Sequence, residues 1–425
     1  MVFTRRDFLK LGSVTAVAAA ATGCAVIGPE LARGELPETL VMPPAAVVDP
    51  VWRLLNRAGF GAAPGEPTRV RKMGVEAYLE EQLHPESIDD AAADFISSSL
   101  TLYHMDPTQL VEQDEKDAMV ELIGSTLLRA LYSKRQLYEA MVAFWSDHFN
   151  IYVRKAKPMP MLKLMDDRDV IRPYALGKFR DLLFASAKSP AMLVYLDNIQ
   201  NEKSQPNENY ARELLELHTM GVNSGYTQDD IQELARALTG WSVGRRGRNT
   251  GKWIFNEDQH DDGEKQVLGL TLHAGDGAAG VERVLELLST HPATANFIAT
   301  KLVRRFVADE PPAALVDRVT DTFLETDGDI KRLLQVIFLS DEFASAPPKL
   351  KRPFAFMVSA LRALHTRLRM GRRRAIGDWL LRLGQLPFHW PPPDGYPDVS
   401  AAWATNLLPR WNFVLALLHG EIPGA

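Results

Sequence analysis

The chain has 425 residues, of which 46% are hydrophobic and 24% are charged, and its formal net charge is -6. This balance is typical of a globular protein and excludes a wholly disordered, collagen-like or membrane-embedded body. A slightly acidic chain offers no overall positive field for a polyanion, so we expect no nucleic-acid partner. Basic runs at 245–248 and 367–374 indicate solvated surface, with phosphate or lipid-headgroup contact as the alternative.

The first 24 residues predict an export signal. Arg5 and Arg6 precede a Phe-Leu pair, a lysine and a weakly apolar stretch over residues 11–21, a pattern that resembles a twin-arginine signal. The Ala-Thr-Gly that ends at Gly23, followed by Cys24, resembles a lipobox, in which the cysteine thiol carries a diacylglycerol. We therefore expect a lipid-anchored protein at the periplasmic or outer face of a membrane. An ordinary secretory signal, or cleavage without lipidation, is the alternative.

Cys24 is the one cysteine of the chain, which excludes an intramolecular disulfide and a thiolate metal site. Residues 25–49 are rich in Pro, Gly, Ala and Glu and lack a helical period, which predicts a flexible tether. We expect residues 50–425 to form a single helical domain. The apolar stretch of the leader is too short to span a bilayer of about 30 Å.

Apolar residues in the body recur at helical spacing, which predicts an all-α fold made of many helices. One such row of apolar residues, an apolar stripe along one side of a helix, runs from Met141 to Tyr152. Others lie in 231–238, where Thr227 and Asp230 form a capping box, in 330–338 and in 354–368. A small β-hairpin is expected within 253–272, with its turn at 261–263, and a rigid proline-rich loop over 387–397.

The segment from Asn207 to His218 is the most informative block. At about 100° per residue, Glu208, Arg212 and Glu216 share one polar face. One interpretation is the wall of a cleft, in which carboxylates and an arginine act as general acid and base. The other is a ladder of surface ion pairs that contributes a few tenths of a kcal/mol per pair.

Two inward histidines, His148 and His218, lack the i, i+3 or i, i+4 partners of a helical metal site, so no metal ligands are predicted. His260 and Asp261 lie in a polar turn that is either a binding site or a hairpin tip. The sequence contains no Gly-x-Ser-x-Gly, Walker or dinucleotide motif, which argues against serine-hydrolase, P-loop and Rossmann chemistry.

Several of these blocks occur together and in order in a known family. They are Phe144-Trp145 with His148-Phe149, 190–198, 207–218, 226–241, His260-Asp261 and 391–397. With these motifs the body resembles the bacterial family called domain of unknown function eighteen hundred. The resemblance implies an exported helical protein without a settled activity. It also implies a secreted sulfatase-like or phosphatase-like partner. Members commonly carry His and Asn where this chain has Ser146 and Asp147, which weakens a metal scheme around His148.

The leading hypothesis is an envelope enzyme that acts on a polar substrate in one concave cleft. Its candidate catalytic residues are Asp197, Glu208, Arg212, Glu216 and His218, and its candidate substrate-binding residues are Asn198, Asn207, Asn209, Trp241, His260 and Asp261. Two alternatives stay open: a non-catalytic partner of another secreted protein, and a redox protein that receives an unidentified cofactor before folded export.

Overall fold

The computed structural model describes residues 48–222, 224–366, 368 and 373–422. Arg5, Arg6, Cys24 and residues 25–47 lie outside the described residues, so the export, lipidation and tether predictions concern parts of the chain for which no structure is described. Within 48–422, helices dominate and the strands are short, which confirms the predicted fold class.

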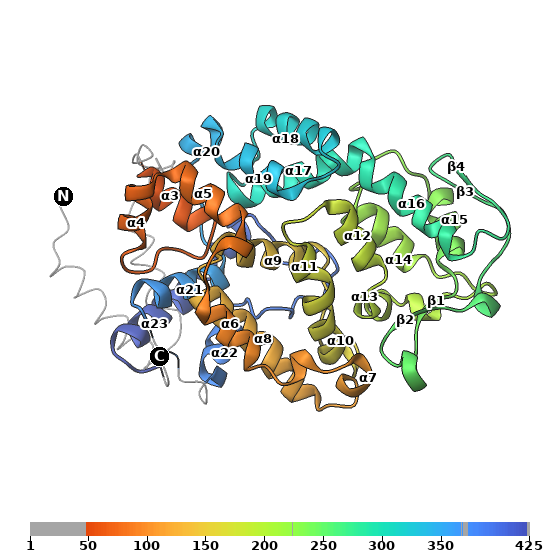
Figure 1. Ribbon diagram of the computed structural model, residues 1–425, viewed down its shortest axis with the longest axis horizontal. Coiled ribbons are helices and arrows are strands. Elements are labelled where there is room, and N and C mark those ends of the chain that lie inside the picture. Colours follow the sequence, from red (N-terminus) through yellow and green to blue (C-terminus); the bar gives the residue numbers. More distant parts are fainter. Residues whose placement is uncertain (1–47, 223, 367, 369–372, 423–425) are drawn as a thin grey trace, which may run out of the picture. The chain divides into compact units, whose positions relative to one another are not determined.

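The first third of the body is a series of helices with short connections (Figure 1). Asp49 is the N-cap of the first of these helices. Its carboxylate accepts a hydrogen bond of 2.9 Å from the backbone N–H of Val51. The helices are α3 (Pro50–Arg57), α4 (Glu66–Met73), α5 (Val75–Leu83), α6 (Ala91–Ser98), α7 (Pro107–Leu110), α8 (Glu115–Tyr132) and α9 (Gln136–His148).

The central part contains two π-helical turns, η3 (Asp167–Ile171) and η5 (Leu214–His218), each of which continues an α-helix. Such turns are rare and are found frequently at functional sites. The α-helices of this part are α10 (Met159–Asp166), α11 (Arg172–Tyr174), α12 (Phe179–Ala187), α13 (Pro190–Tyr195), α14 (Glu208–Glu213) and α15 (Gln228–Leu238). The predicted capping box of α15 is present, with Thr227 and Asp230 bonded to each other's backbone N–H groups.

Two antiparallel pairs of strands follow. β1 (Trp241–Val243) pairs with β2 (Trp253–Phe255), and β3 (Lys265–Val267) pairs with β4 (Leu270–Leu272). The second pair is a hairpin inside the predicted range, and its turn residues Leu268 and Gly269 both have positive φ, as a tight two-residue turn requires. The residues 261–263, which were predicted to be the turn of this hairpin, instead connect the two sheets. The reason is that β2 (Trp253–Phe255) pairs with β1, which precedes it in the chain, and not with β3.

The C-terminal third is again helical. Asp329 caps α19 by accepting a hydrogen bond of 3.2 Å from the N–H of Arg332. The helices are α16 (Ala278–Thr290), α17 (Pro292–Phe306), α18 (Ala313–Glu325), α19 (Ile330–Phe338), α20 (Asp341–Ser345), α21 (Pro353–Ala363), α22 (Arg373–Arg382) and α23 (Leu407–Leu418). No helix in the described ranges is both long enough and apolar enough to cross a bilayer.

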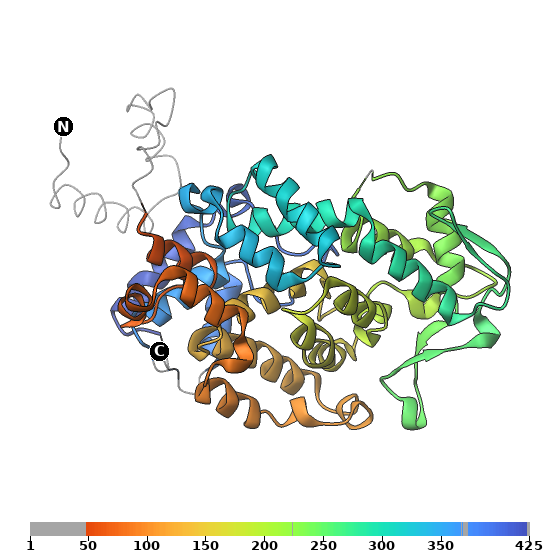
Figure 2. The ribbon, with the colours of Figure 1, turned by 45° about the horizontal axis from the view of Figure 1, so that its top comes forward.

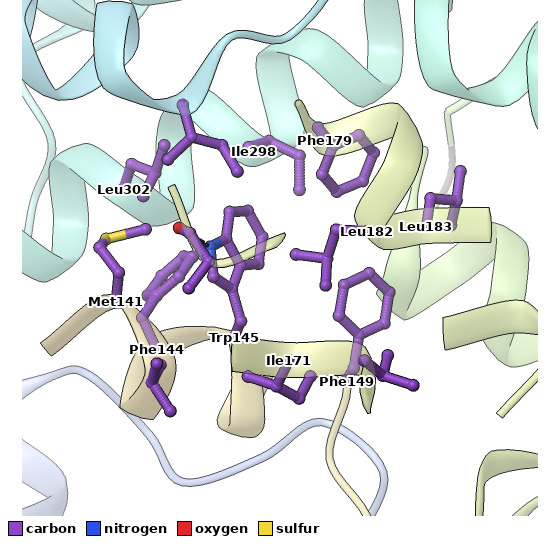
Figure 3. Packing of buried hydrophobic residues seen from close by; sticks show 14 of the residues in the cluster. Met141, Phe144, Trp145, Phe149, Ile171, Phe179, Leu182, Leu183, Ile298 and Leu302 are labelled. Atoms are coloured by element: carbon purple, nitrogen blue, oxygen red, sulfur yellow. Dashed lines mark hydrogen bonds between the residues drawn. The ribbon is translucent and has the colours of Figure 1, made fainter. Parts of the chain in front are cut away.

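Helix α9 contributes to two hydrophobic clusters. Its aromatic side, which includes Phe144 and the fully buried Trp145, packs into the larger cluster against α12 and α17 (Figure 3). The indole N–H of Trp145 donates to the carbonyl of Ala175 at 3.1 Å, so its one polar atom is satisfied. Ala140 belongs to the smaller cluster, which α8, α21, α22 and α23 complete. The helix therefore joins the two parts of the core.

The proline-rich loop explains why α9 ends at His148, before the expected end of the stripe at Tyr152. The side-chain amide of Asn150 donates to the carbonyls of Trp390 and Pro392, at 2.9 and 2.7 Å. These bonds replace a further helical turn and fix the loop to the end of α9. The two β-sheets lie at the opposite end of the body from α23 (Figures 1 and 2).

Candidate functional site

The predicted polar face on α14 and η5 is a ladder of ion pairs. Arg212 lies 2.9 Å from Glu208 and 3.5 Å from Glu216, and Gln228 contacts both Arg212 and Glu208. Glu208, Arg212 and Glu216 are about one third exposed or less and Gln228 is exposed, which is the geometry of the surface alternative. None of the cavities described below is lined by them, and their catalytic role stays a prediction.

The asparagines and Asp197 hold the loop that precedes α14. The amide of Asn198, which is buried, donates to the carbonyls of Leu238 and Trp241 at 3.2 and 2.8 Å. Asn207 caps α14 by accepting from the N–H of Asn209, whose own amide donates to Leu196. Asp197, at a left-handed φ of 60°, pairs with Lys155 at 2.8 Å. The asparagine contacts position backbone, whereas Asp197 forms an ion pair, and the catalytic and binding roles of these residues stay predictions.

His148 and His218 are buried side by side, with ring centroids 6.3 Å apart. The Nε2 of His148 lies 3.0 Å from the carbonyl oxygen of His218, whereas Nδ1 of His148 and Nε2 of His218 have no partner among the described residues. Burial, with the nearby ammonium of Lys301, lowers the pKa of both rings, that of His218 to about 3. Both imidazoles are therefore neutral at pH 7.

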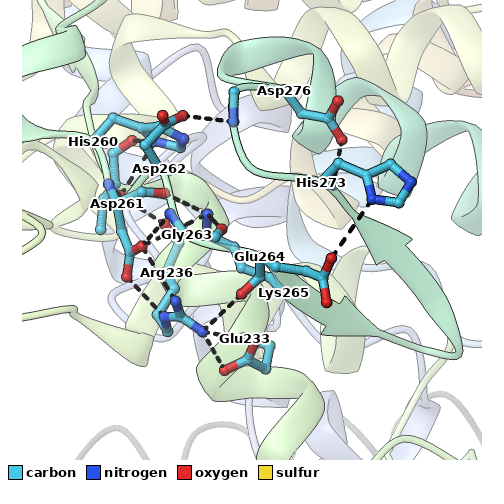
Figure 4. A network of polar contacts seen from close by, with 12 residues as sticks. Glu233, Arg236, His260, Asp261, Asp262, Gly263, Glu264, Lys265, His273 and Asp276 are labelled. Carbon is cyan, nitrogen blue, oxygen red and sulfur yellow. Dashed lines mark hydrogen bonds and ion pairs between the residues drawn. The ribbon is translucent and has the colours of Figure 1, made fainter.

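The turn at His260 and Asp261 is a dense polar network (Figure 4). Asp261 pairs with Arg236 at 2.7 Å, and this hydrogen bond holds the pKa of the carboxyl below its usual range. His260 contacts the carbonyl of Thr239 through Nδ1 at 2.8 Å. The adjoining cavity of about 10 Å³ has room for roughly one water. Trp241 is fully buried, away from solvent.

A cavity that the sequence did not predict lies between α3, the C-terminal end of α17 and the segment that leads into α21. Its volume is about 90 Å³. We call it the basic cavity, because five cationic side chains and one carboxylate line it: Arg57, Arg305, Lys349, Lys351, Arg352 and Asp398. No other lining side chain is charged.

Asp398 cannot neutralise this many cations. Its carboxylate accepts hydrogen bonds from Arg305 at 2.6 Å and from Arg352 at 2.9 Å, and both arginines help to keep its pKa low. Arg352 also pairs with the half-buried Asp147. The Nε of Arg352 is nevertheless buried without a hydrogen-bond partner among the described residues. A buried N–H of this kind should have an acceptor, which an anion in the cavity would supply.

Burial disfavours the charged forms of the lysines of the basic cavity. Burial, together with the neighbouring guanidinium groups of Arg362 and Arg57, lowers the pKa of Lys351 to about 8. Burial also lowers the pKa of Lys349 to about 8, although Asp309 lies 3.1 Å from its ammonium group. Burial and repulsion from Arg53 lower the pKa of Arg57 to about 10.

A second cavity, of about 50 Å³, shares Arg352 and Phe60 with the basic cavity. We call it the acidic cavity, because Glu139, Asp147 and Asp167 line it. Burial raises the pKa of Asp147, and the ion pair with Arg352 opposes this effect. The hydroxyl of Ser146 and Oδ1 of Asp167 are buried there without partners among the described residues, which indicates room for a few bound waters.

The sequence contains one local signal for the basic cavity, the run Lys349-Leu350-Lys351-Arg352 directly before Pro353. The other cations, Arg57 and Arg305, are nearly 250 residues apart and meet only in the folded chain. Within the described residues, no group of three or more His, Cys, Asp or Glu side chains is placed to hold a metal ion.

Comparison with curated proteins and with solved structures found no significant match. Residues 53–422, which include α9, both cavities and α23, match one sequence family. The chain therefore belongs to the family described as Protein of unknown function (DUF1800).

Proposed function

We propose that this protein binds a small oxyanion, either a free phosphate or sulfate or such a group on a larger molecule, in the basic cavity. The observation that supports the proposal is the excess of cations around it: five cationic side chains line the cavity, whereas three carboxylates, Asp398, Asp147 and Asp309, pair with them. Arginine and lysine together are the usual ligands of phosphate and sulfate, because guanidinium N–H groups match the geometry of paired oxygens.

The lowered pKa values of Lys349 and Lys351 give this proposal a specific thermodynamic consequence. Burial above all disfavours the charged form of both ammonium groups. A bound anion favours their charged forms, so anion binding should raise both pKa values and should be accompanied by proton uptake near pH 8. The affinity for sulfate, which does not titrate in this range, should therefore fall as the pH rises from 7 to 9.5.

Isothermal titration of the purified chain with inorganic phosphate and sulfate, at constant ionic strength, tests the proposal. The double variant Arg57→Gln/Lys349→Met removes two cations from the cavity and should weaken binding by roughly tenfold or more. Lys252→Met is the matched control, because Lys252 is an exposed lysine with a single acidic contact, Asp106, outside the cavity. Equal affinity in the double variant and the control, or no binding at millimolar anion, would overturn the proposal.

Turnover distinguishes a binding protein from an enzyme. The leading hypothesis from the sequence was acid-base catalysis on a polar envelope substrate. The carboxylates that line the cavity beside the basic cavity are Glu139, Asp147 and Asp167, rather than those on α14. An enzyme of this class should hydrolyse p-nitrophenyl phosphate or sulfate and should lose that activity in Asp147→Asn. Binding of the anions without hydrolysis would favour a transport or sensing role.

We also propose that the protein works at the cell envelope, attached to a membrane through Cys24. The Arg5-Arg6 signal and the lipobox-like residues that end at Cys24 support this location. Replacing both arginines with lysine should keep the protein in the cytoplasm, and Cys24→Ser should abolish labelling with radioactive palmitate. Unchanged export of the lysine variant would contradict the proposed route.

A further inference from the structure

The outward face of α23 is a continuous apolar stripe. Its five side chains keep large exposed fractions, namely Leu407 60%, Leu408 69%, Trp411 56%, Leu415 40% and Leu418 64%. At about 100° per residue these positions fall within an arc of about 100° on one side of the helix. Single exposed apolar residues are common on proteins, but five on one short helix face indicate a binding surface.

The opposite face of α23 is fixed to the body. Phe413 is fully buried, and it packs edge to face with Trp379 of α22, with ring centroids 5.7 Å apart. The guanidinium group of Arg410 donates to the carbonyl of Lys351 at 2.8 Å and lies over the ring of Phe356. The helix therefore cannot roll to bury its apolar stripe without losing these contacts.

The stripe lies at the end of the body where the described chain begins. The ammonium of Lys351 donates to Asn56 of α3 at 2.6 Å, and the carbonyl of the same lysine accepts from Arg410 of α23. Helices α3, α21 and α23 lie at the same end of the body in both views (Figures 1 and 2). Helix α3, with which the described chain begins, is thus connected to α23 through Lys351.

We propose that the outward face of α23 docks on the surface of a lipid bilayer, with Trp411 at headgroup depth and the leucines below it. This inference does not need the oxyanion site, but it rests on the proposed lipid anchor at Cys24. Only 23 residues separate Cys24 from Val48, so a flexible tether would span about 25–30 Å on average. Such a short tether gives α23 a high effective concentration at the membrane, which adds to the affinity that the apolar face has for a bilayer by itself.

Co-sedimentation with neutral phosphatidylcholine vesicles tests the docking face, using the full chain with Cys24→Ser so that no lipid is attached. Neutral vesicles carry no net charge, so the basic cavity should contribute little. Leu408→Glu/Leu418→Glu should weaken vesicle binding by roughly tenfold or more. The matched control is Leu324→Glu/Leu339→Glu, which changes two leucines that are 41% and 49% exposed outside α23. The leader is common to all these proteins and cancels from the comparison.

Two further measurements make the result decisive. Quenching of tryptophan fluorescence by brominated lipid should occur in the parent chain and should be largely lost in Trp411→Phe. Phosphate titration of the same proteins should be unaffected by the α23 changes, so that failure of the docking face and failure of the oxyanion site are distinguishable. Absence of vesicle binding, equal binding by both double variants, or a dimer that the α23 variant abolishes would overturn the membrane proposal.

Discussion

The buried histidine pair should make the protein sensitive to mild acid. In the folded chain the pKa of His218 is lowered from 6.5 to about 3, because burial penalises the charged ring. In the unfolded chain the ring is solvated and binds a proton below about pH 6.5. The unfolded state then binds more protons than the folded state, so stability is lost as the pH falls from 6.5 toward 3.

The magnitude follows from the size of this shift. Between pH 7.5 and pH 5.0, one histidine that stays neutral in the folded state costs about 2 kcal/mol of the free energy of unfolding. His148, whose pKa is also lowered well below 6.5, adds a loss of the same sign. For His218→Leu, which removes one of the two titrating rings, the loss of stability on acidification should therefore be smaller by about 2 kcal/mol.

Urea denaturation at pH 7.5 and pH 5.0 measures this difference. The free energy of unfolding of the parent and of His218→Leu is extrapolated to water at each pH, and the two pH-dependent losses are compared. Titration of the carboxylates is common to both proteins and cancels, as does any direct cost of the substitution. An equal loss in both proteins would refute the inference that His218 is buried in its neutral form.

Three other substitutions have defined expectations. Trp145→Ala leaves a cavity in the larger hydrophobic cluster and should lower the free energy of unfolding by about 3–5 kcal/mol in urea denaturation, whereas a loss below about 1 kcal/mol would contradict its buried position. Gly395→Ala should destabilise the protein by more than about 1 kcal/mol in thermal unfolding, because its φ is 75° and a Cβ would overlap the carbonyl of Asp147; unchanged stability would refute this packing. Arg212→Ala should cost less than about 1 kcal/mol and leave phosphate affinity unchanged, since the Glu208 pair is a surface pair; loss of binding would move the site to α14.

Local features of the fold were predictable from the sequence. The capping box at Thr227 and Asp230 acts on residues within one helical turn, so it is visible in the sequence, and it is present in the structure. The end of α9 was not predictable, because the bonds of Asn150 to the 387–397 loop form only in the folded chain. The same reason explains why β2 pairs with β1 instead of with β3.

The basic cavity was even less predictable from the sequence than the end of α9. Arg57, Arg305 and Lys349 come from three separate parts of the chain, and no spacing rule connects them. The sequence drew attention instead to Glu208 and Arg212, where like and opposite charges are close in sequence and easy to recognise. Charge patterns along a helix predict its surface, whereas a cavity depends on which surfaces meet during folding.

The two π-helical turns fix the directions of the groups that follow them. η3 ends just before Arg172, whose guanidinium group pairs with Glu139 at 3.0 Å and with Asp167 at 2.8 Å, and η5 ends at His218. Removing one residue from either five-residue turn would rotate every later side chain of that helix by about 100°. His218 would leave its aromatic surroundings, and Arg172 would release two buried carboxylates. These short segments should therefore tolerate exchanges of side chain far better than changes of length.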